Sequence, residues 1–551
     1  MRIVSVTLNG QYKGLRDQTF DFSYIDSNIQ AFIGLNGAGK SQLLELIAEV
    51  FAYVERWQRQ DFTTNTGLNF GVELVYSIQT LNLPAAQSLF KIVIKPGSEP
   101  APYTYGVSVG WLKWVNEIPL PDHIIGYSSG LNANLQGAFL KNMVQYFDVQ
   151  RIKLKRQKEL SYKKNNEKQY DEINQQYVEK YPHLFERSSY GELRERPSDI
   201  SVLFFLDYDS ARLLISSLGM LPRSELKDVF AECRFRYPSK IVFSYNLAND
   251  QVEADTVSDI KMLLRIAGKD NSKGVGKQAT EQQYNMFELD YMKGEITFDL
   301  KDAAVRERLF EFNYGDPLQF FKRLFKAQQL GIKKWRAEDV RKLRRDDFFD
   351  NVKKPLKGKL PITIKELCLS DDHHTQITYD DLSDGEAQLI EILGIARLFS
   401  SRNTLFLLDE PETHLNPAWR TYFHTHLTKA LKPEFEQNTQ VLLSTHSPFM
   451  ISSLRKNNVF LFKRGRYDRI EMQPIGEQTF GTTFEILVKR YFGLTSAISQ
   501  SAVAEVKRRL SIESDNEALV KPENKIDVRQ WIDTNLGESM EKAYLLRKLQ
   551  R

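Results

Sequence analysis

Gly34-Leu35-Asn36-Gly37-Ala38-Gly39-Lys40-Ser41 is the stretch of sequence that decides the fold. It fits the pattern G-x-x-x-x-G-K-[ST], in which glycines turn backbone N–H groups toward a phosphate at the start of a helix. Both flanks agree with this interpretation. The apolar run Gln30–Ile33 predicts a strand before the loop, and Ser41–Tyr53 carries apolar residues at helical spacing after it. A glycine-rich turn of purely structural use would not explain the lysine, the serine and both flanks together.

Three further motifs follow far downstream. Leu382-Ser383-Asp384-Gly385-Glu386 comes first, Thr404–Pro411 second, and Ser444-Thr445-His446-Ser447 third. The apolar run before Asp409 predicts a central buried strand, which holds a carboxylate rigidly. Asp409 therefore suits a metal ligand, and Glu410 beside it suits a general base.

Together these motifs resemble, in the same order, the Walker A, signature, Walker B and switch-histidine motifs of ABC-type ATPase heads of the SMC, Rad50 and RecF group. The resemblance implies ATP and Mg²⁺ as cofactors. The nucleotide-binding residues are then Asn36, Gly37, Ala38, Gly39, Lys40, Ser41, Gln42, Ser383, Gly385 and Glu386. The metal ligands are Ser41 and Asp409, and the catalytic residues are Glu410 and His446. Lys40 would contact the β- and γ-phosphates.

The signature motif departs from the usual LSGGQ at two places. Ser383 and Gly385 remain, and Asp384 adds a negative charge near the expected phosphate. Ser383 followed three residues later by Glu386 is also a capping box at a helix start. The two interpretations are compatible, because a capped helix with free N–H groups is itself an anion site.

More narrowly, Asp409–Pro417 followed by Ser444–Pro448 resembles the bacterial defence ATPases of the OLD family and the PtuA ATPases of Septu and retron systems. The short N-terminal lobe and the segment Phe480–Gly493 fit the PtuA type best. This resemblance implies a homodimer, or a higher assembly of dimers, in which Ser383 and Gly385 of one subunit close the Lys40 site of the other. It also implies a separate HNH nuclease and, in retron forms, a reverse transcriptase with its DNA product.

The sequence predicts an α/β fold: an ABC-type head with a P-loop, a mixed sheet and an antiparallel β lobe. A large, mostly helical insert would interrupt this head, and a helical tail would follow it. The expected domains are 1–136 and 361–480 for the head, 137–360 for the insert and 481–551 for the tail. The other N-terminal strands are expected at Met1–Leu8, Gln18–Tyr24, Phe70–Ile78, Leu89–Ile94, Tyr103–Val109 and His123–Gly130.

Within the insert, Gln150–Tyr181 is polar and predicts an exposed helix or hairpin. A strand is expected at Lys240–Tyr245, and helices at Ser201–Met220, Ser224–Cys233 and Ala303–Arg345. Val202–Asp207 resembles a Walker B strand, but Tyr208 stands where the catalytic glutamate should be. Leu405–Glu410 is therefore the better candidate.

Composition excludes several classes of protein. Hydrophobic residues make up 42% and charged residues 26% of the 551-residue chain, and no apolar run is long enough to span a bilayer. The N-terminus predicts a strand and not a cleaved signal. Cys233 and Cys368 form no ligand pattern and suit a reducing cytoplasm. His414, His424 and His426 lack metal-site spacing, because residues two apart on a helix point to different faces.

A net charge of +4 is nearly neutral for this length, so any argument for nucleic acid must come from local clusters. Two basic tracts occur in the insert. They are either solvated helix faces or contacts for nucleic acid or an acidic partner. The tracts are Arg151, Lys153, Lys155, Arg156, Lys158, Lys163 and Lys164, and Arg336, Arg341, Lys342, Arg344 and Arg345.

Three functions compete at this point: a defence ATPase that regulates a partner nuclease, a RecF- or Rad50-like DNA-repair ATPase, and an ATP-bound scaffold with negligible turnover. Long paired heptads and a zinc hook would favour Rad50, but the polar segment Gln150–Tyr181 is short and no C-x-x-C occurs. An OLD-type Toprim nuclease needs a D-x-D pair, and none follows His446. We therefore expect that the chain alone contains no nuclease centre.

Overall fold

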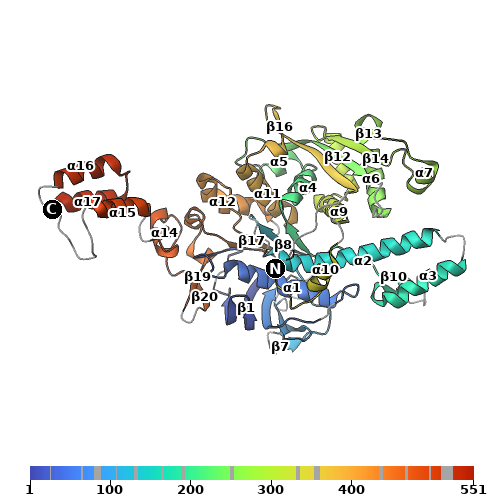
Figure 1. The fold of residues 1–551 in the computed structure, drawn as a ribbon, viewed down its shortest axis with the longest axis horizontal. Coiled ribbons are helices and arrows are strands. Elements are labelled where there is room, and N and C mark those ends of the chain that lie inside the picture. The colour runs from blue at the N-terminus through green and yellow to red at the C-terminus, as the bar shows by residue number, and fades with distance from the viewer. Residues whose placement is uncertain are drawn as a thin grey trace.

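Three large sheets and the helices around them form the body of the molecule (Figure 1), and β9 (Phe185–Arg187) and β10 (Leu193–Glu195) form a small two-stranded sheet besides. The computed structural model describes residues 1–24, 27–63, 66–79, 89–106, 108–129, 134–162, 167–187, 193–247, 254–330, 335–350, 352, 360–401, 403–433, 438–465, 469–494, 498–509 and 525–550. Among the helices of these residues, none is long and apolar enough to cross a membrane.

The central sheet has the strand order β11-β8-β17-β18-β3-β19-β20. Every neighbouring pair is parallel except β19 and β20, which are antiparallel. The strands are β3 (Ile29–Gly34), β8 (His123–Ser128), β11 (Leu203–Leu206), β17 (Thr404–Asp409), β18 (Thr439–Ser444), β19 (Val459–Arg464) and β20 (Ile470–Pro474). This sheet confirms the α/β fold class.

The central strands are apolar on both faces, because each face is covered. Alternate residues of one strand belong to different hydrophobic cores: Leu405 and Leu407 lie in one, and Phe406 and Leu408 lie in the other. The first core is shared with α1 (Lys40–Gln58) and the antiparallel lobe. The second is shared with α4 (Tyr208–Leu218), α9 (Pro317–Leu330), α11 (Asp384–Phe399) and α12 (Pro417–Ala430).

The antiparallel lobe is a six-stranded sheet of order β2-β1-β4-β5-β6-β7. Its strands are β1 (Arg2–Tyr12), β2 (Leu15–Asp21), β4 (Gly71–Ser77), β5 (Leu89–Ile94), β6 (Ala101–Gly106) and β7 (Gly110–Lys113). The predicted N-terminal strands are present, with bounds that differ by a few residues, and β5 matches its prediction at both ends. Gly130 of the predicted strand that became β8 lies outside the described residues.

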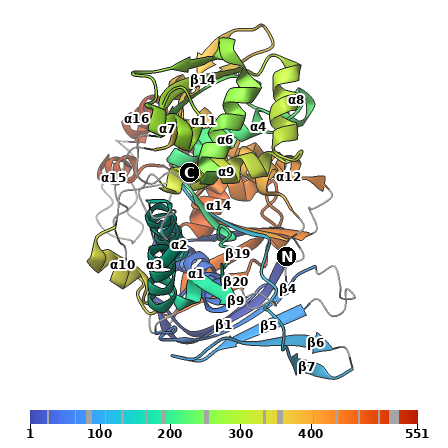
Figure 2. The ribbon, with the colours of Figure 1, turned by 90° about the vertical axis from the view of Figure 1, so that its right-hand side faces the viewer.

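A third, five-stranded sheet has the order β13-β14-β12-β15-β16 and lies at the end of the molecule opposite the antiparallel lobe (Figure 2). Its strands are β12 (Tyr237–Asn246), β13 (Ser272–Gly274), β14 (Lys293–Asp299), β15 (Ile362–Ser370) and β16 (Gln376–Thr378). β12 pairs with β14 on one side and β15 on the other, so strands from both sides of position 360 share one sheet. The four-domain division stays a prediction.

The predicted helix at Ser201–Met220 was wrong in its first part. Leu203–Leu206 form β11, which pairs in parallel with β8, and α4 begins only at Tyr208. The physical reason is that large apolar side chains on both faces suit a strand packed between two cores. The helix predicted at Ser224–Cys233 was too long, because α5 covers only Arg223–Leu226.

The polar segment Gln150–Tyr181 lies in a helical hairpin, as predicted. The hairpin consists of α2 (Gln136–Tyr162) and α3 (Glu167–Lys180) and projects to one side of the body (Figure 1). Lys163 and Lys164 lie outside the described residues. The remaining elements are β9 (Phe185–Arg187), β10 (Leu193–Glu195), α6 (Ala254–Ala267), α7 (Glu281–Phe287), α8 (Ala303–Phe312), α10 (Ala337–Leu343), α13 (Pro448–Ser452), α14 (Phe484–Tyr491), α15 (Gln500–Arg509), α16 (Lys525–Asn535) and α17 (Met540–Gln550).

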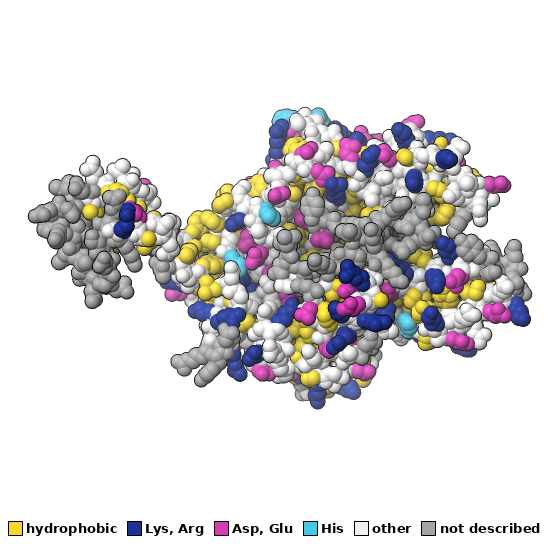
Figure 3. All heavy atoms as spheres, in the orientation of Figure 1, with side chains coloured by type: hydrophobic (Ala, Val, Ile, Leu, Met, Phe, Trp, Pro, Cys, Tyr) yellow, Lys and Arg dark blue, Asp and Glu magenta, His cyan; other side chains and the backbone are white. Residues whose placement is uncertain are grey.

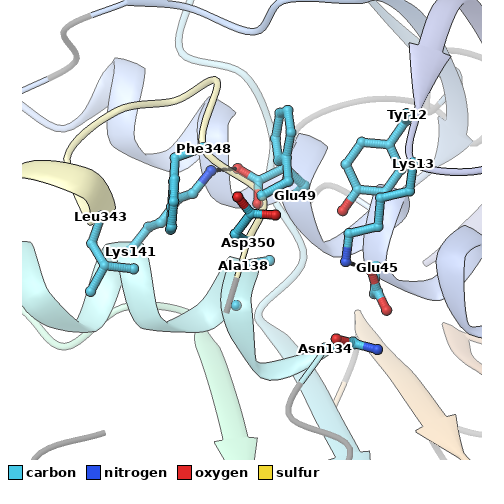
Figure 4. Close-up of a pocket in the computed structure, with 12 residues that line it drawn as sticks. Tyr12, Lys13, Glu45, Glu49, Asn134, Ala138, Lys141, Leu343, Phe348 and Asp350 are labelled. Carbon is cyan, nitrogen blue, oxygen red and sulfur yellow. Dashed lines mark hydrogen bonds and ion pairs between the residues drawn. The ribbon is translucent and has the colours of Figure 1, made fainter. Parts of the chain in front are cut away.

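A buried set of charges ties α1 to the insert. Glu49 accepts a hydrogen bond from Lys141 Nζ at 2.6 Å, drawn in Figure 4, and pairs with Arg56 at 3.3 Å. Arg56 also donates to Asp346 at 3.1 Å and to Asn142 at 2.6 Å. All these side chains are almost inaccessible to solvent. Burial lowers the pKa of Lys141, and the Glu49 carboxylate opposes that shift. A small cavity of about 10 Å³ beside this set, room for one water, is lined by Tyr12, Glu45 and Asp350 (Figure 4).

Replacement of Asp346 by alanine is expected to destabilise the protein strongly, because Arg56 would remain buried without its full set of partners. The expected loss is roughly 3–5 kcal/mol of unfolding free energy. Chemical denaturation followed by far-ultraviolet circular dichroism measures it. Glu338→Ala is the matched control, since the Glu338–Lys342 pair is exposed to solvent and its loss should leave the midpoint unchanged. Equal midpoints for the two variants would contradict the prediction.

Candidate functional site

Three of the four sequence motifs lie together within a single copy of the chain: the loop Gly34–Ser41, Asp409–Glu410 and Thr445–His446. The signature motif Leu382–Glu386 lies apart from them. β3, β17 and β18 are parallel neighbours, so their carboxyl ends lie at the same edge of the central sheet. Asp409 stands opposite Ser444 in the register of β17 and β18, and Ser444 stands opposite Phe32 of β3. The loops that leave this edge are Gly34–Ser41, Asp409–Glu410 and Thr445–His446. Such an edge is where open α/β sheets bind their ligands.

The phosphate-type loop is held by close backbone packing. Gly34 has φ 138°, and a Cβ there would lie 2.3 Å from the carbonyl oxygen of Phe462, so only glycine fits. Gly39, at φ 91°, is the N-cap of α1. Lys40 Nζ donates to the carbonyl oxygens of Gly34 at 3.1 Å and Leu35 at 3.2 Å. Burial lowers the pKa of Lys40 to about 8, although the carboxylates of Glu410, Asp409 and Glu412 oppose the shift.

Ser41 and Asp409, the two expected metal ligands, lie side by side. Ser41 Oγ donates to Asp409 Oδ1 at 2.7 Å, and Ser444 Oγ donates to the same oxygen at 2.5 Å. Asp409 is buried, and burial raises its pKa while the hydrogen bonds from Ser444 and Ser41 lower it. A hydroxyl and a carboxylate are the oxygen ligands that Mg²⁺ prefers. The residues present therefore fit that ion.

Glu410 and His446 face each other across the same edge. His446 Nε2 lies 3.2 Å from Glu410 Oε1, and this hydrogen bond holds the pKa of Glu410 below its usual value. Glu410 has a left-handed backbone with φ 50°. Its N–H donates to the carbonyl oxygen and to Oγ of Ser444, both at 3.2 Å. Left-handed non-glycine residues are costly and gather at functional sites, so the sheet holds Glu410 in a defined position.

Ser383, Gly385 and Glu386 lie at the start of α11. Ser383 is its N-cap, and a capping box joins it to Glu386: the Glu386 carboxylate accepts from Ser383 N at 3.1 Å and from Ser383 Oγ at 2.7 Å. A Cβ on Gly385 would lie 2.9 Å from the carbonyl oxygen of His414, so glycine is required here. Ser383 and Glu386 thus bond to each other within this turn, and the described hydrogen bonds do not join them to the loop Gly34–Ser41.

Three other residues expected to bind the nucleotide, Gln42, Asn36 and Ala38, differ in their surroundings. Gln42 Oε1 accepts a hydrogen bond from Gly14 N at 3.1 Å, so its side chain holds the β1–β2 turn. Asn36 is exposed at the tip of the loop, and Ala38 is buried beneath it. Arg464, which sequence reasoning missed, is exposed at the end of β19 and donates to the carbonyl oxygen of Gly37 at 2.9 Å.

A second feature missed from the sequence is a buried relay behind the site. Gln388 of α11 accepts from His414 N at 2.8 Å and lies 3.4 Å from the Tyr127 hydroxyl. Tyr127 in turn lies 3.4 Å from Glu391. Burial, with a smaller contribution from Asp207, raises the pKa of Glu391 to about 8. Burial also raises the pKa of Glu412 to about 7, and Thr445 Oγ1 donates to that carboxylate. No local sequence pattern indicates these contacts.

Several side chains of the basic tracts form ion pairs or hydrogen bonds within the chain, many of them at the surface. Arg156 pairs with Glu195, and Lys153 donates to the carbonyl oxygen of Arg196. In the second tract, Arg344 pairs with Asp148 at 2.7 Å, and Lys342 and Arg345 pair with Glu338 and Asp347, also at 2.7 Å. Of the histidines, His426 lies 3.0 Å from Glu232. These contacts favour a structural use of both tracts.

The loop, the paired serine and aspartate and the Glu410–His446 pair have the arrangement expected for the ATPase site of an ABC-type head. A protein-family profile described as "AAA domain, putative AbiEii toxin, Type IV TA system" matches residues 286–452, which include the signature, Asp409, Glu410 and His446.

Two curated proteins are similar over shorter stretches. Protein ea59 of Escherichia phage lambda is 26% identical over 203 residues, 32% of this chain and 37% of that protein. The Retron Ec83 probable ATPase of Escherichia coli is 24% identical over 194 residues, 30% of this chain and 34% of that protein. The chain thus matches about a third of the length of each relative.

Solved structures similar to this chain include SMC head domains. The Smc head with an extended coiled coil from Pyrococcus furiosus shares 13% identity, with coverage of 86% of this chain and 96% of that chain and a TM-score of 0.30. The SMC head domain from Thermotoga maritima shares 11% identity, with coverage of 87% and 100% and a TM-score of 0.27.

Glu391→Gln is expected to change the pH dependence of stability. The folded pKa of Glu391, about 8, lies above its ordinary value of 4.5. The contribution of Glu391 to the free energy of unfolding is therefore fully present below pH 4.5, and it is lost as the pH rises from 4.5 through 8, by about 1.4 kcal/mol per pH unit. Because the amide cannot ionise, the variant should become more stable relative to the wild type as the pH rises over this range.

Denaturation midpoints of both proteins between pH 5 and pH 9 measure this difference. Glu311→Gln, at an exposed position of α8, is the control and should follow the wild type at every pH. A constant difference between Glu391→Gln and the wild type from pH 5 to pH 9 would show that Glu391 is ionised in the folded protein throughout.

Proposed function

We propose that this chain binds ATP and Mg²⁺ at the carboxyl edge of the central sheet, hydrolyses the ATP, and thereby controls a separate nuclease in an anti-phage defence complex. The observation that carries the ATPase part is the convergence of Ser41, Asp409 and Glu410 at one edge. These residues come from two motifs far apart in the sequence, and a fold without this chemistry would have no reason to bring them together.

The residues divide the work of hydrolysis. The N–H groups of the loop Gly34–Ser41 and the Lys40 ammonium bind the β- and γ-phosphates. Ser41 and Asp409 would hold Mg²⁺, which supplies positive charge to the phosphate oxygens when bound. Glu410 orients the attacking water and accepts its proton, and a low pKa keeps this carboxylate ionised for that task. His446 orients Glu410 through their hydrogen bond.

Closure of the site is proposed to require a second copy of the chain. Ser383 is exposed at the start of α11, where the first N–H groups of the helix form an anion site. In the proposed dimer, Ser383, Gly385 and Glu386 of one copy face the nucleotide bound by Lys40 of the other. ATP then joins the two copies, and hydrolysis releases them. Pairs of dimers would form the higher assembly.

The defence role is proposed because the chain is similar to the Retron Ec83 probable ATPase and to a protein family whose description names a toxin–antitoxin system. On this proposal a separate HNH nuclease of the PtuB kind acts with the chain in the cytoplasm. A retron reverse transcriptase with its DNA product would hold the complex in check.

Glu410→Gln is expected to keep ATP affinity and lose hydrolysis by at least about 100-fold, because the amide keeps the shape of the side chain but cannot accept a proton. With ATP it should accumulate as a dimer in sedimentation velocity. Lys40→Ala is the matched control: it should lose ATP binding, because the cation at the phosphates is missing, and stay monomeric. Unchanged turnover in Glu410→Gln would move the general base to another residue.

The purified chain alone is expected to leave DNA and RNA intact with Mg²⁺ or Mn²⁺, with and without ATP. Cleavage should appear only when an HNH nuclease encoded beside the gene is added, and Lys40→Ala should alter that response. Among the described residues, no group of three or more His, Cys, Asp or Glu side chains is placed to hold a metal ion. Cleavage by the chain alone that survives Lys40→Ala would reveal a nuclease centre in it and refute the regulatory role.

A further inference from the structure

The hairpin of β19 and β20 packs along the outside of the loop Gly34–Ser41. A Cβ on Gly34 would lie 2.3 Å from the carbonyl oxygen of Phe462, in β19. A Cβ on Gly39 would lie 2.6 Å from Cδ1 of Ile470, in β20. A side chain at either glycine would therefore collide with the hairpin. The hairpin thus contacts the loop both at its first residue and at the residue just before Lys40.

Between these two packing contacts, Arg464 makes a polar contact with the middle of the loop. Arg464 Nε and Nη2 both donate to the carbonyl oxygen of Gly37, at 3.2 Å and 2.9 Å. Hydrogen bonds from a guanidinium are charge-assisted, and its donors are held in a fixed plane. Two donors of one rigid group on one oxygen therefore restrain the direction of the Gly37 carbonyl group.

The peptide unit between Gly37 and Ala38 is bonded on both sides. In a planar trans peptide, the carbonyl group and the following N–H point in opposite directions. The Gly37 carbonyl accepts from Arg464, and the Ala38 N–H donates to the carbonyl oxygen of Leu35 at 3.2 Å. This peptide unit comes just before Gly39, the N-cap of α1. Its orientation therefore sets how the first N–H groups of α1 are presented.

Other basic side chains lie on the same hairpin and provide an internal comparison. Figure 3 shows Lys and Arg side chains on the surface at β19 and β20, and Lys463, Arg464 and Arg469 are exposed there. Successive side chains of a strand point to opposite faces. Lys463 therefore adds the same charge as Arg464 close to the loop, but from the other face of β19. The two residues separate the effect of charge from the effect of the contact with Gly37.

From these contacts we propose that Arg464 is a positioning residue for nucleotide binding, which holds the loop through Gly37 in the arrangement that binds the β-phosphate. The inference rests on the proposed ATPase function and adds a residue outside its sequence motifs. A loop that is already ordered loses less conformational entropy when its ligand binds. Arg464 therefore contributes to the affinity for ATP and for ADP alike, because both carry a β-phosphate, and it takes no part in the proton transfer to Glu410.

Arg464→Ala tests this role by equilibrium binding of the N-methylanthraniloyl derivatives of ATP and ADP. Both affinities should fall by about tenfold, the size expected for the loss of charge-assisted hydrogen bonds. In steady-state turnover, KM for ATP should rise by a similar factor while kcat stays within about twofold, because binding is lost equally in the ground state and the transition state. The denaturation midpoint without nucleotide should match the wild type, since Arg464 is exposed.

Lys463→Ala is the matched control, because it removes one positive charge from the same hairpin and leaves the contact with Gly37 in place. Its affinities for both nucleotides should stay close to those of the wild type. An equal loss in Lys463→Ala, a loss confined to ATP, or a fall in kcat with KM unchanged would each overturn the positioning role. Wild-type affinity in Arg464→Ala would overturn it too and leave the proposed function standing. A wild-type chain that binds neither nucleotide would overturn the proposed function itself.

Discussion

The carboxylate of Asp409 is the interaction on which the rest of the site depends. It is buried between two cores and accepts hydrogen bonds from Ser41 Oγ and Ser444 Oγ at one oxygen. A buried carboxylate must be satisfied, and its two donors come from the first turn of α1 (Ser41) and the end of β18 (Ser444). Polar contacts at the ends of β17 and β18, as well as side-chain packing, therefore fix the position of these strands relative to each other and to α1. A one-residue slip would also exchange the two hydrophobic cores.

The helix that follows the phosphate loop extends this constraint into the insert. α1 is buried along nearly its whole length, and its buried side chains include charges as well as apolar groups. Glu49 and Arg56 bind Lys141 and Asp346, and Glu55 accepts from Asn142 at 2.6 Å. Charged groups in such a place are stable only when every partner is present. The insert residues 141–142 and 346 are therefore structural components of the helix that carries Lys40 and Ser41.

Short sequence patterns predicted the elements that depend mainly on neighbouring residues. The loop, its flanking strand and helix, and the strand before Asp409 follow from spacing and apolar runs. The predicted helix at Ser201–Met220 included Leu203–Leu206, and it is the pairing with β8 that shows this stretch to be a strand. Sequence shows that Arg344 is charged but not that Asp148, 196 positions away, neutralises it. The Gln388–Tyr127–Glu391 relay likewise joins a helix and a strand with no shared period.

His446 is where these separate constraints meet. Its imidazole lies 3.2 Å from the carboxylate of Glu410 on one side, and its ring lies near Phe492 on another. Glu410 cannot relax freely, because its left-handed backbone is bonded to Ser444. Phe492 is likewise placed by α14, whose N-terminal Phe484 packs on Phe449. A rotation of the imidazole toward a phosphate would therefore change its contact with Glu410 and its contact with Phe492, at the end of α14, at the same time. His446 thus joins the position of the general base to that of the segment that follows the site, through its contacts with Glu410 and Phe492.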